Sequence, residues 1–265
     1  MTAIAHFNQG DLDAAVDAAT QDVKADPTSA IPRVILAEML CFAGDWERAD
    51  TILEAAGVIE PAAGVGISQF RFLIQAEAAR RDFYTHGQMP TFLSDAGDAA
   101  KQRLAAALLI REGDLTTAAE VLGEMETQRA AVPGKHGDDA FTDFRDGDDL
   151  LGDFVEVLSP DGRYFWIATS EVRSMQFEPP GRPLDLLFRQ ATLVTVKAQG
   201  EVFIPVLYAG VEAAEADLRL GRATDWRGNA DEPVRGVGQR VFFADETELP
   251  VLELTSLSFD TGEDD

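Results

Sequence analysis

In the first half of the chain, hydrophobic residues recur every three or four positions, the spacing that gathers them on one face of an α-helix. One such run extends from Ile31 to Leu40, a second from Ile52 to Ala56, and a longer third from Ile67 to Phe83, with an interruption near Gly87 to Pro90. The pattern predicts a series of helices that each bury one side.

The helical pattern also repeats. Gln9-Gly10-Asp11-Leu12 recurs as Ala43-Gly44-Asp45-Trp46, an offset of 44 − 10 = 34 residues, and the same offset brings Asp26-Pro27 onto Glu60-Pro61. A third copy, Glu112-Gly113-Asp114-Leu115, follows after 113 − 44 = 69 residues. A period of about 34 is typical of tetratricopeptide (TPR) repeats, in which each unit is an antiparallel helix pair. We therefore predict a degenerate, TPR-like array of about three units.

Stacked helix pairs expose a groove that can bind a peptide or a partner helix. The alternative is that these helices only cover the neighbouring domain.

From Val132 to Asp149 the chain is rich in Pro, Gly and Asp, so the helical period stops and a domain boundary is expected near residue 135. Short runs of β-branched and aromatic residues follow, which predict strands. They are Phe154–Leu158, Tyr164–Ala168, Val172–Phe177, Ala191–Val196, Val202–Leu207, Arg240–Phe243 and Val251–Phe259. Only Val211–Leu220 has helical composition.

The expected fold class is therefore α+β: a TPR-like helical domain over residues 1–135 and a β-rich domain over residues 136–260 with one or two helices. Because closure hides unpaired strand edges, the many short strands favour a small antiparallel barrel or a strongly curved sheet. An acidic tail, residues 261–265, completes the chain, and we expect it to be disordered.

Charge narrows the class of partner. The chain has 47 acidic and 22 basic residues and a formal charge of −25, so it should repel nucleic acid and anionic membranes. Cys41 is the only cysteine, and no signal peptide or membrane-spanning run is recognisable. We expect a cytoplasmic protein.

No catalytic, cofactor-binding or metal site is predicted. His6, His86 and His136 lie in separate segments, and the motifs of common hydrolases and nucleotide enzymes are absent. The aspartates between Asp138 and Asp149 could gather a hard cation such as calcium, but they lack the spacing and closing Glu of an EF-hand. A solvated interdomain loop is the favoured interpretation.

Two polar segments, Gly221–Trp226 and Gly236–Arg240, stand apart from the predicted strand cores. Thr224 and Asp225 can tie a loop by hydrogen bonds to the backbone, and Trp226 can anchor it by burying apolar surface. Arg222 can pair with a carboxylate. Either the segments staple the structure or they form a partner-contact patch.

Five segments in order along the chain resemble the ImpE/TagJ family of type VI secretion accessory proteins. They are Gly10–Ala15, Leu40–Ala49, Gly162–Trp166, Gly221–Trp226 and Gly238–Arg240. Leu184–Phe188 is also similar, although the family pattern has a Trp where Phe188 stands.

The resemblance implies a non-catalytic cytoplasmic adaptor without cofactors. Its implied partner is the small subunit of the contractile sheath, bound through that subunit's N-terminal helix, and it would modulate sheath assembly or recycling by the ClpV-type ATPase. The candidate partner-contact or family-signature residues are Trp46, Tyr164, Trp166, Arg222, Thr224, Asp225, Trp226, Gly238, Gln239 and Arg240.

Two other hypotheses stay open. One is an enzyme or small-ligand sensor whose pocket in the β-rich domain is lined by Arg222, Asp225, Trp226 and Gln239. The other is a homodimer that uses the β-rich domain as its dimer face.

Overall fold

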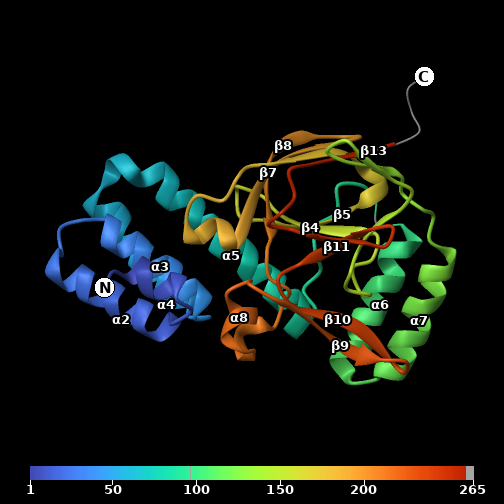
Figure 1. The fold of residues 1–265 in the computed structure, drawn as a ribbon, viewed down its shortest axis with the longest axis horizontal. Coiled ribbons are helices and arrows are strands. Elements are labelled where there is room, and N and C mark those ends of the chain that lie inside the picture. The colour runs from blue at the N-terminus through green and yellow to red at the C-terminus, as the bar shows by residue number, and fades with distance from the viewer. Residues whose placement is uncertain (96, 261–265) are drawn as a thin grey trace.

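The computed structural model describes residues 1–95 and 97–260, so the predicted acidic tail lies outside the described residues. Helices fill the first half, as predicted. They are α1 (Ala3–Asn8), α2 (Leu12–Ala25), α3 (Ile31–Phe42), α4 (Trp46–Ile59), the short η1 (Pro61–Ala63), α5 (Gly64–His86), α6 (Asp98–Glu112) and α7 (Leu115–Gln128). Figure 1 shows α1–α4 at one end of the molecule, α6 and α7 at the other, and the long α5 between them.

The repeated Gly-Asp pairs all form the same kind of turn between helices. Gly10, Gly44 and Gly113 have φ of 86°, 80° and 81°, a left-handed conformation that glycine adopts at little cost. The aspartate that follows each glycine caps the next helix by accepting an N–H bond three residues on, at 3.0, 3.4 and 3.3 Å. The sequence repeat therefore marks three equivalent turns, while TPR-like stacking of the helix pairs stays a prediction.

Strands begin directly after the helices. They are β1 (Gly134–His136), β2 (Asp139–Phe141), β3 (Phe144–Asp146), β4 (Phe154–Leu158), β5 (Tyr164–Ala168), β6 (Val172–Phe177), β7 (Phe188–Thr195), β8 (Gln199–Pro205), β9 (Thr224–Asn229), β10 (Glu232–Gly238), β11 (Val241–Ala244), β12 (Thr247–Pro250) and β13 (Ser256–Phe259). Short helical turns lie between them at η2 (Thr169–Glu171), η3 (Pro183–Leu186), η4 (Val211–Ala213) and α8 (Ala216–Arg219). The last two occupy the segment of predicted helical composition.

The predicted closed barrel is wrong. The main sheet has the order β2-β1-β13-β6-β7-β8-β4-β5 and stays open, with a separate sheet β12-β11-β3 and the hairpin β9–β10. One open edge is protected by other means, because Thr91 after α5 forms a parallel bridge beside Phe165 of β5 and exchanges backbone hydrogen bonds with Tyr164 and Trp166. The β5 edge is therefore paired without closure of the sheet.

The segment from Val132 to Asp149 is also more ordered than predicted. It contains β1, β2 and β3, and β1 pairs with β13 near the other end of the chain. Asp146 and Asp148 are buried, so the interpretation of this segment as a solvated loop is wrong for these two residues.

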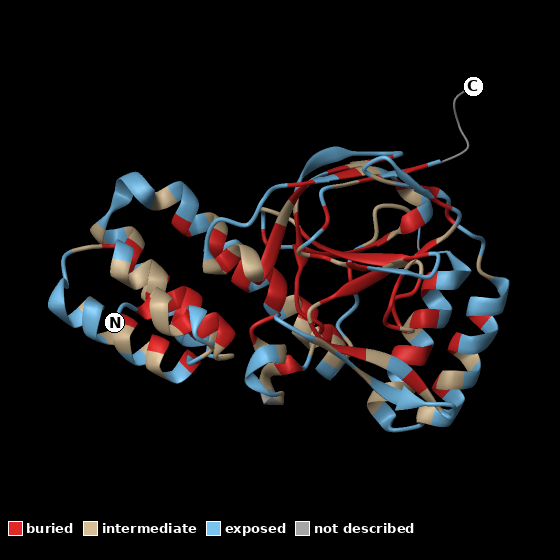
Figure 2. Cartoon of the chain, in the orientation of Figure 1, coloured by how far each residue is buried: buried red, intermediate tan, exposed pale blue. Residues whose placement is uncertain are grey.

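Buried side chains from both halves form one continuous hydrophobic cluster. Figure 2 shows the buried residues concentrated in the sheet and on the inward faces of the helices. From α5, Phe83 packs edge-on against Trp166 of β5 with ring centroids 4.9 Å apart. Because α5 contributes to the core beneath the sheet, it joins the two predicted domains, whose division at residue 135 stays a proposal. None of the described helices is both long and apolar enough to cross a bilayer.

Candidate functional site

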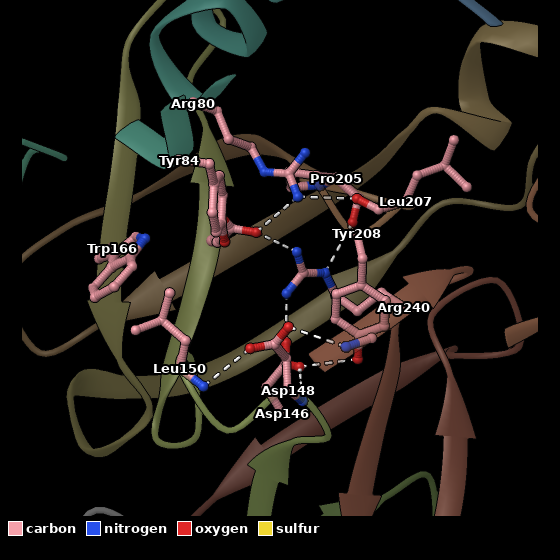
Figure 3. A network of polar contacts seen from close by, with 12 residues as sticks. Arg80, Tyr84, Asp146, Asp148, Leu150, Trp166, Pro205, Leu207, Tyr208 and Arg240 are labelled. Atoms are coloured by element: carbon pink, nitrogen blue, oxygen red, sulfur yellow. Dashed lines mark hydrogen bonds and ion pairs between the residues drawn. The ribbon is translucent and has the colours of Figure 1, made fainter. Parts of the chain in front are cut away.

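A network of buried charges lies where α5 meets the sheets, and Figure 3 shows it from close by. At its centre Arg240, which lies between β10 and β11 and has no exposed surface, donates to the carboxylates of Asp146 and Glu156. Its Nε also donates to the carbonyl of Pro205 at 3.0 Å. Three segments distant in sequence are thus held by one guanidinium group.

Glu156 of β4 accepts from four donors. Arg80 of α5 approaches one carboxylate oxygen at 3.0 Å beside Arg240. Tyr84 donates to the other oxygen at 2.9 Å, and Tyr164 donates to the same oxygen. The carboxylate is therefore saturated.

The network extends outward from Tyr164 and from Arg80. The indole N–H of Trp166 donates to the Tyr164 hydroxyl, which explains why this Trp can be fully buried on β5. Arg80 also pairs with Glu77 one turn earlier on α5 at 3.1 Å, and it donates to the carbonyl of Leu207 at 3.0 Å.

The other end of the network is built on Asp146 and Asp148. The Tyr208 hydroxyl donates to Asp146 at 3.0 Å, and Arg235 of β10 donates to Asp148 at 2.7 Å. The backbone N–H of Leu150 binds Asp148 at 3.0 Å, so the turn between β3 and β4 is fixed by its own side chains.

The balance of burial and charge differs between the two central carboxylates. Burial disfavours ionisation of Glu156, but the guanidinium groups of Arg80 and Arg240 outweigh it and lower the pKa to about 2. For Asp146, burial prevails over the charge of Arg240 and raises the pKa to about 6. Burial also raises the pKa of Tyr84, Tyr164 and Tyr208 well above 10, so these phenols stay protonated donors.

The buried charge network is better suited to stabilising the fold than to acid–base catalysis. Its carboxylates already accept hydrogen bonds from arginines, tyrosines or backbone amides, and its phenols are not bases at neutral pH. Two further aspartates of the 138–149 segment are occupied likewise: Asp143 pairs with Arg129, and Asp149 accepts the N–H of Val234 at 2.7 Å. Across residues 1–95 and 97–260, no group of three or more His, Cys, Asp or Glu side chains is placed to hold a metal ion.

The structure brings most of the predicted site residues together around the β9–β10 hairpin. Thr224 pairs with Gly238 across the two strands, and its hydroxyl donates to the carbonyl of Gln239 at 2.8 Å. Gly238 has φ of 90°, and a Cβ there would lie 2.3 Å from the carbonyl oxygen of Ala223, so only glycine fits. The side chain of Gln239 donates to the carbonyl of Gly221 at 2.6 Å.

Asp225 and Trp226 lie on β9 of the same hairpin. The Asp225 side chain is exposed and accepts the N–H of Trp226 at 2.9 Å. The Trp226 ring packs between Tyr208 and Phe243, with centroids 5.9 and 6.1 Å away. It leaves no room for a side chain at Gly147, where a Cβ would meet the indole at 2.3 Å. Asp225 and Trp226 therefore contribute to the structure and packing of the hairpin.

Arg222 reaches across to the helical half. Its Nη2 donates to the carbonyls of Phe7 and Asn8 at 2.7 and 3.1 Å, at the C-terminal end of α1, where the i+4 hydrogen bonds of the helix end. Arg222 therefore pairs with backbone and not with the expected carboxylate. Arg222 contacts α1, whereas the Trp226 ring contacts Tyr208 and Phe243, so these two residues of the hypothetical ligand pocket are engaged in different places.

Trp46 lies apart from the other signature residues. It is half-buried at the start of α4, where its ring packs against Phe188 at 6.2 Å and beneath the guanidinium of Arg81 at 5.9 Å. The same ring lines a surface groove between α4 and α5.

Sequence reasoning missed much of the buried network. Arg80, Glu156, Tyr208 and Arg235 were not singled out, although a lone Glu in the apolar run Phe154–Leu158 is a signal that a buried partner must exist. The charged partners of Glu156 are Arg80 of α5 and Arg240 between β10 and β11, both more than 70 residues away in sequence, so no local pattern could have identified them.

Known proteins resemble this chain in both sequence and fold. The model of the ImpE protein family matches residues 138–258, which include most of the network and the hairpin. A crystal structure of protein VPA1032 from Vibrio parahaemolyticus has the same fold, with a TM-score of 0.90 and 27% identity over 97% of both chains. The type VI secretion system accessory component TagJ of Pseudomonas aeruginosa is 32% identical over 254 residues, 95% of this chain and 88% of its own length. The chain therefore belongs to the ImpE/TagJ family.

Proposed function

We propose that this protein is a non-catalytic accessory component of type VI secretion, an adaptor that binds the N-terminal helix of the small sheath subunit. Kinship with TagJ supports the secretion role, and the saturated carboxylates of the buried network support the absence of catalysis. The three equivalent Gly-Asp turns support a TPR-like array of helix pairs, a scaffold suited to holding a helix.

One observation favours a helical partner. A groove of about 860 Å³, which we call the α4–α5 groove, is lined by Trp46 and by a row of α5 residues that includes Ser68, Phe72, Gln75 and Thr85. Its α5 residues are spaced three or four apart from residue 68 to residue 85, so the groove follows the helix for roughly 25 Å at 1.5 Å per residue. That length matches several turns of a second helix laid alongside.

The chemistry of the groove fits an amphipathic helix. Phe72 lines the groove and is 42% exposed. The indole ring of Trp46 also lines it, with the guanidinium of Arg81 stacked over the ring. Arg71 of α5 and Asp50 of α4 form a partly exposed ion pair at 2.7 Å, and both residues line the groove. A helix with an apolar stripe flanked by charged residues would contact both kinds of surface.

The test is capture of the purified small sheath subunit by the immobilised full-length protein. We expect the wild type to enrich the subunit and Phe72→Glu to reduce capture about tenfold, since a charge would be buried against the partner's apolar stripe. Leu108→Glu on α6 is the matched control, because Leu108 is 47% exposed and lies outside the groove. No enrichment by a folded wild type would refute sheath binding.

By holding the sheath subunit, the protein would modulate sheath assembly or its recycling by the ClpV-type ATPase, which it would meet only indirectly. The same proposal places it in the cytoplasm, where the sheath subunit is made. Self-association through the β-rich half is a separate proposal, and light scattering of the purified protein measures it directly.

A further inference from the structure

A second cavity, of about 300 Å³, lies between the C-terminal ends of α5 and α6, the β9–β10 hairpin and the segment 209–212. Four arginines line it, Arg81, Arg111, Arg227 and Arg235, against a single acidic residue, Glu212. In a chain with 47 acidic and 22 basic residues, this concentration of positive charge opposes the character of the whole molecule. We call it the arginine cavity.

Only two of the four arginines are paired with carboxylates. Arg81 lies 3.5 Å from Glu212, and Arg235 lies 2.7 Å from the buried Asp148. Arg111 donates to the carbonyl of Phe83 at 3.2 Å but has no carboxylate within 4.0 Å among residues 1–95 and 97–260. Over the same residues, Arg227 makes neither a side-chain hydrogen bond nor an ion pair. Two positive charges therefore stay uncompensated at the cavity.

Strand pairing adds an independent observation. Arg227 of β9 stands directly opposite Arg235 of β10 in the antiparallel hairpin. Like charges in directly opposed positions destabilise a strand pair. Asp148 offsets the charge of Arg235, so the pairing leaves Arg227 as the guanidinium group on this wall that an anion could still neutralise.

We propose that the arginine cavity binds a phosphoryl group. A phosphate monoester carries close to two negative charges at neutral pH, which matches the two uncompensated guanidinium groups. The planar fork of an arginine can donate two parallel hydrogen bonds to phosphate oxygens. The volume lies at the small end of ligand sites, so the phosphoryl group arrives on a small molecule or on a single phosphorylated side chain.

Isothermal titration calorimetry of the full-length protein in a phosphate-free buffer tests the proposal, with inorganic pyrophosphate in one arm and a phosphoserine peptide in the other. We expect binding in at least one arm, and the responding arm identifies the source of the phosphoryl group. Arg227→Gln should weaken this binding about tenfold or more, since a charge-assisted hydrogen bond is lost. Added salt should weaken it further.

Arg173→Gln is the matched control, because Arg173 is likewise an exposed strand arginine but lies on β6, outside the cavity. It should bind as the wild type does. Arg111→Gln, which approaches the cavity from α6, gives a second, independent reduction. Absence of binding in both arms, or equal losses in Arg173→Gln and Arg227→Gln, would overturn the proposal.

Discussion

At the scale of single residues, Arg240 is the residue on which the buried network depends. Its guanidinium neutralises both Asp146 and Glu156 and has no exposed surface. In the Gly238–Arg240 segment, Gly238 has φ of 90° at the end of β10, and Arg240 follows it just before β11. Burial of Tyr164, Trp166 and Arg240 keeps all three side chains from the molecular surface.

We predict that Arg240→Met destabilises the protein by about 3–5 kcal/mol. Loss of Arg240 leaves the buried Asp146 without its counter-charge and leaves Glu156 with Arg80 as its one cationic partner among the described residues. An unpaired buried charge costs more than the pair contributes when intact. Urea unfolding measures the change, and Arg173→Met at an exposed position of β6 serves as the control. A loss below about 1 kcal/mol, the size of an ordinary surface effect, would contradict a central role for Arg240.

A second prediction concerns Glu38, which is buried on α3 beside Arg182 and Asp185 of the η3 region. Burial raises its pKa from 4.5 to about 7, although Arg182 lies 3.5 Å away and opposes the shift. Between pH 4.5 and 7 the native state therefore binds a proton that the unfolded state has released. Stability contributed at this position is present below pH 4.5 and is lost as the pH rises through 7.

Glu38→Gln removes this titration. The unfolding free energy of the wild type relative to Glu38→Gln should fall by about 3 kcal/mol between pH 4.5 and pH 8, at 1.36 kcal/mol for each pKa unit. Chemical unfolding of both proteins across this range provides the measurement, and the difference cancels contributions from other groups. A difference independent of pH would show that Glu38 ionises normally in the folded protein.

At the scale of elements, the repeated Gly-Asp turns set where helices stop and restart. Asp114 accepts the N–H of Thr117 at 3.3 Å and caps α7. Asp114→Ala should lower the unfolding free energy by about 1 kcal/mol, because the first turn of α7 loses its acceptor. Asp114→Asn keeps an oxygen in the same place and should lose only a few tenths. Thermal or urea unfolding distinguishes the two variants, and equal losses would argue against capping.

The hairpin β9–β10 was not predicted as strands, and the reason is physical. Residues Thr224–Asn229 of β9 are mostly exposed and polar, so that strand lacks the pattern of a half-buried strand. The hairpin is held through Trp226 packed on Tyr208 and through Arg235 bound to Asp148. Such contacts are made across the fold and leave no local pattern.

At the scale of the whole molecule, α5 ties the helical half to the sheets. It supplies Arg80 to the buried network and Phe83 to the core around Trp166, and the buried residues form one continuous cluster. We therefore expect the two halves to unfold together, even though they differ in secondary structure.

Trp46→Phe makes this testable, because the two remaining tryptophans, Trp166 and Trp226, both report on the β-rich half. The denaturant midpoint from tryptophan fluorescence should coincide with that from the helical circular dichroism signal. Two separated transitions would instead indicate that the halves are independent domains joined by a helix.

The sequence by itself determined the helical first half, its repeated Gly-Asp turns, most strands after residue 150 and the family, because these follow from local spacing and turn chemistry. Tertiary structure decided that the sheet stays open, that Asp146 and Asp148 are buried, and that Arg80, Glu156 and Arg240 meet. A charged residue is stable in a core only if distant segments bring it partners, and the identity of those partners is a property of the folded chain. The arginine cavity likewise could not be predicted from the sequence, since its four arginines come from α5, α6 and the paired strands β9 and β10.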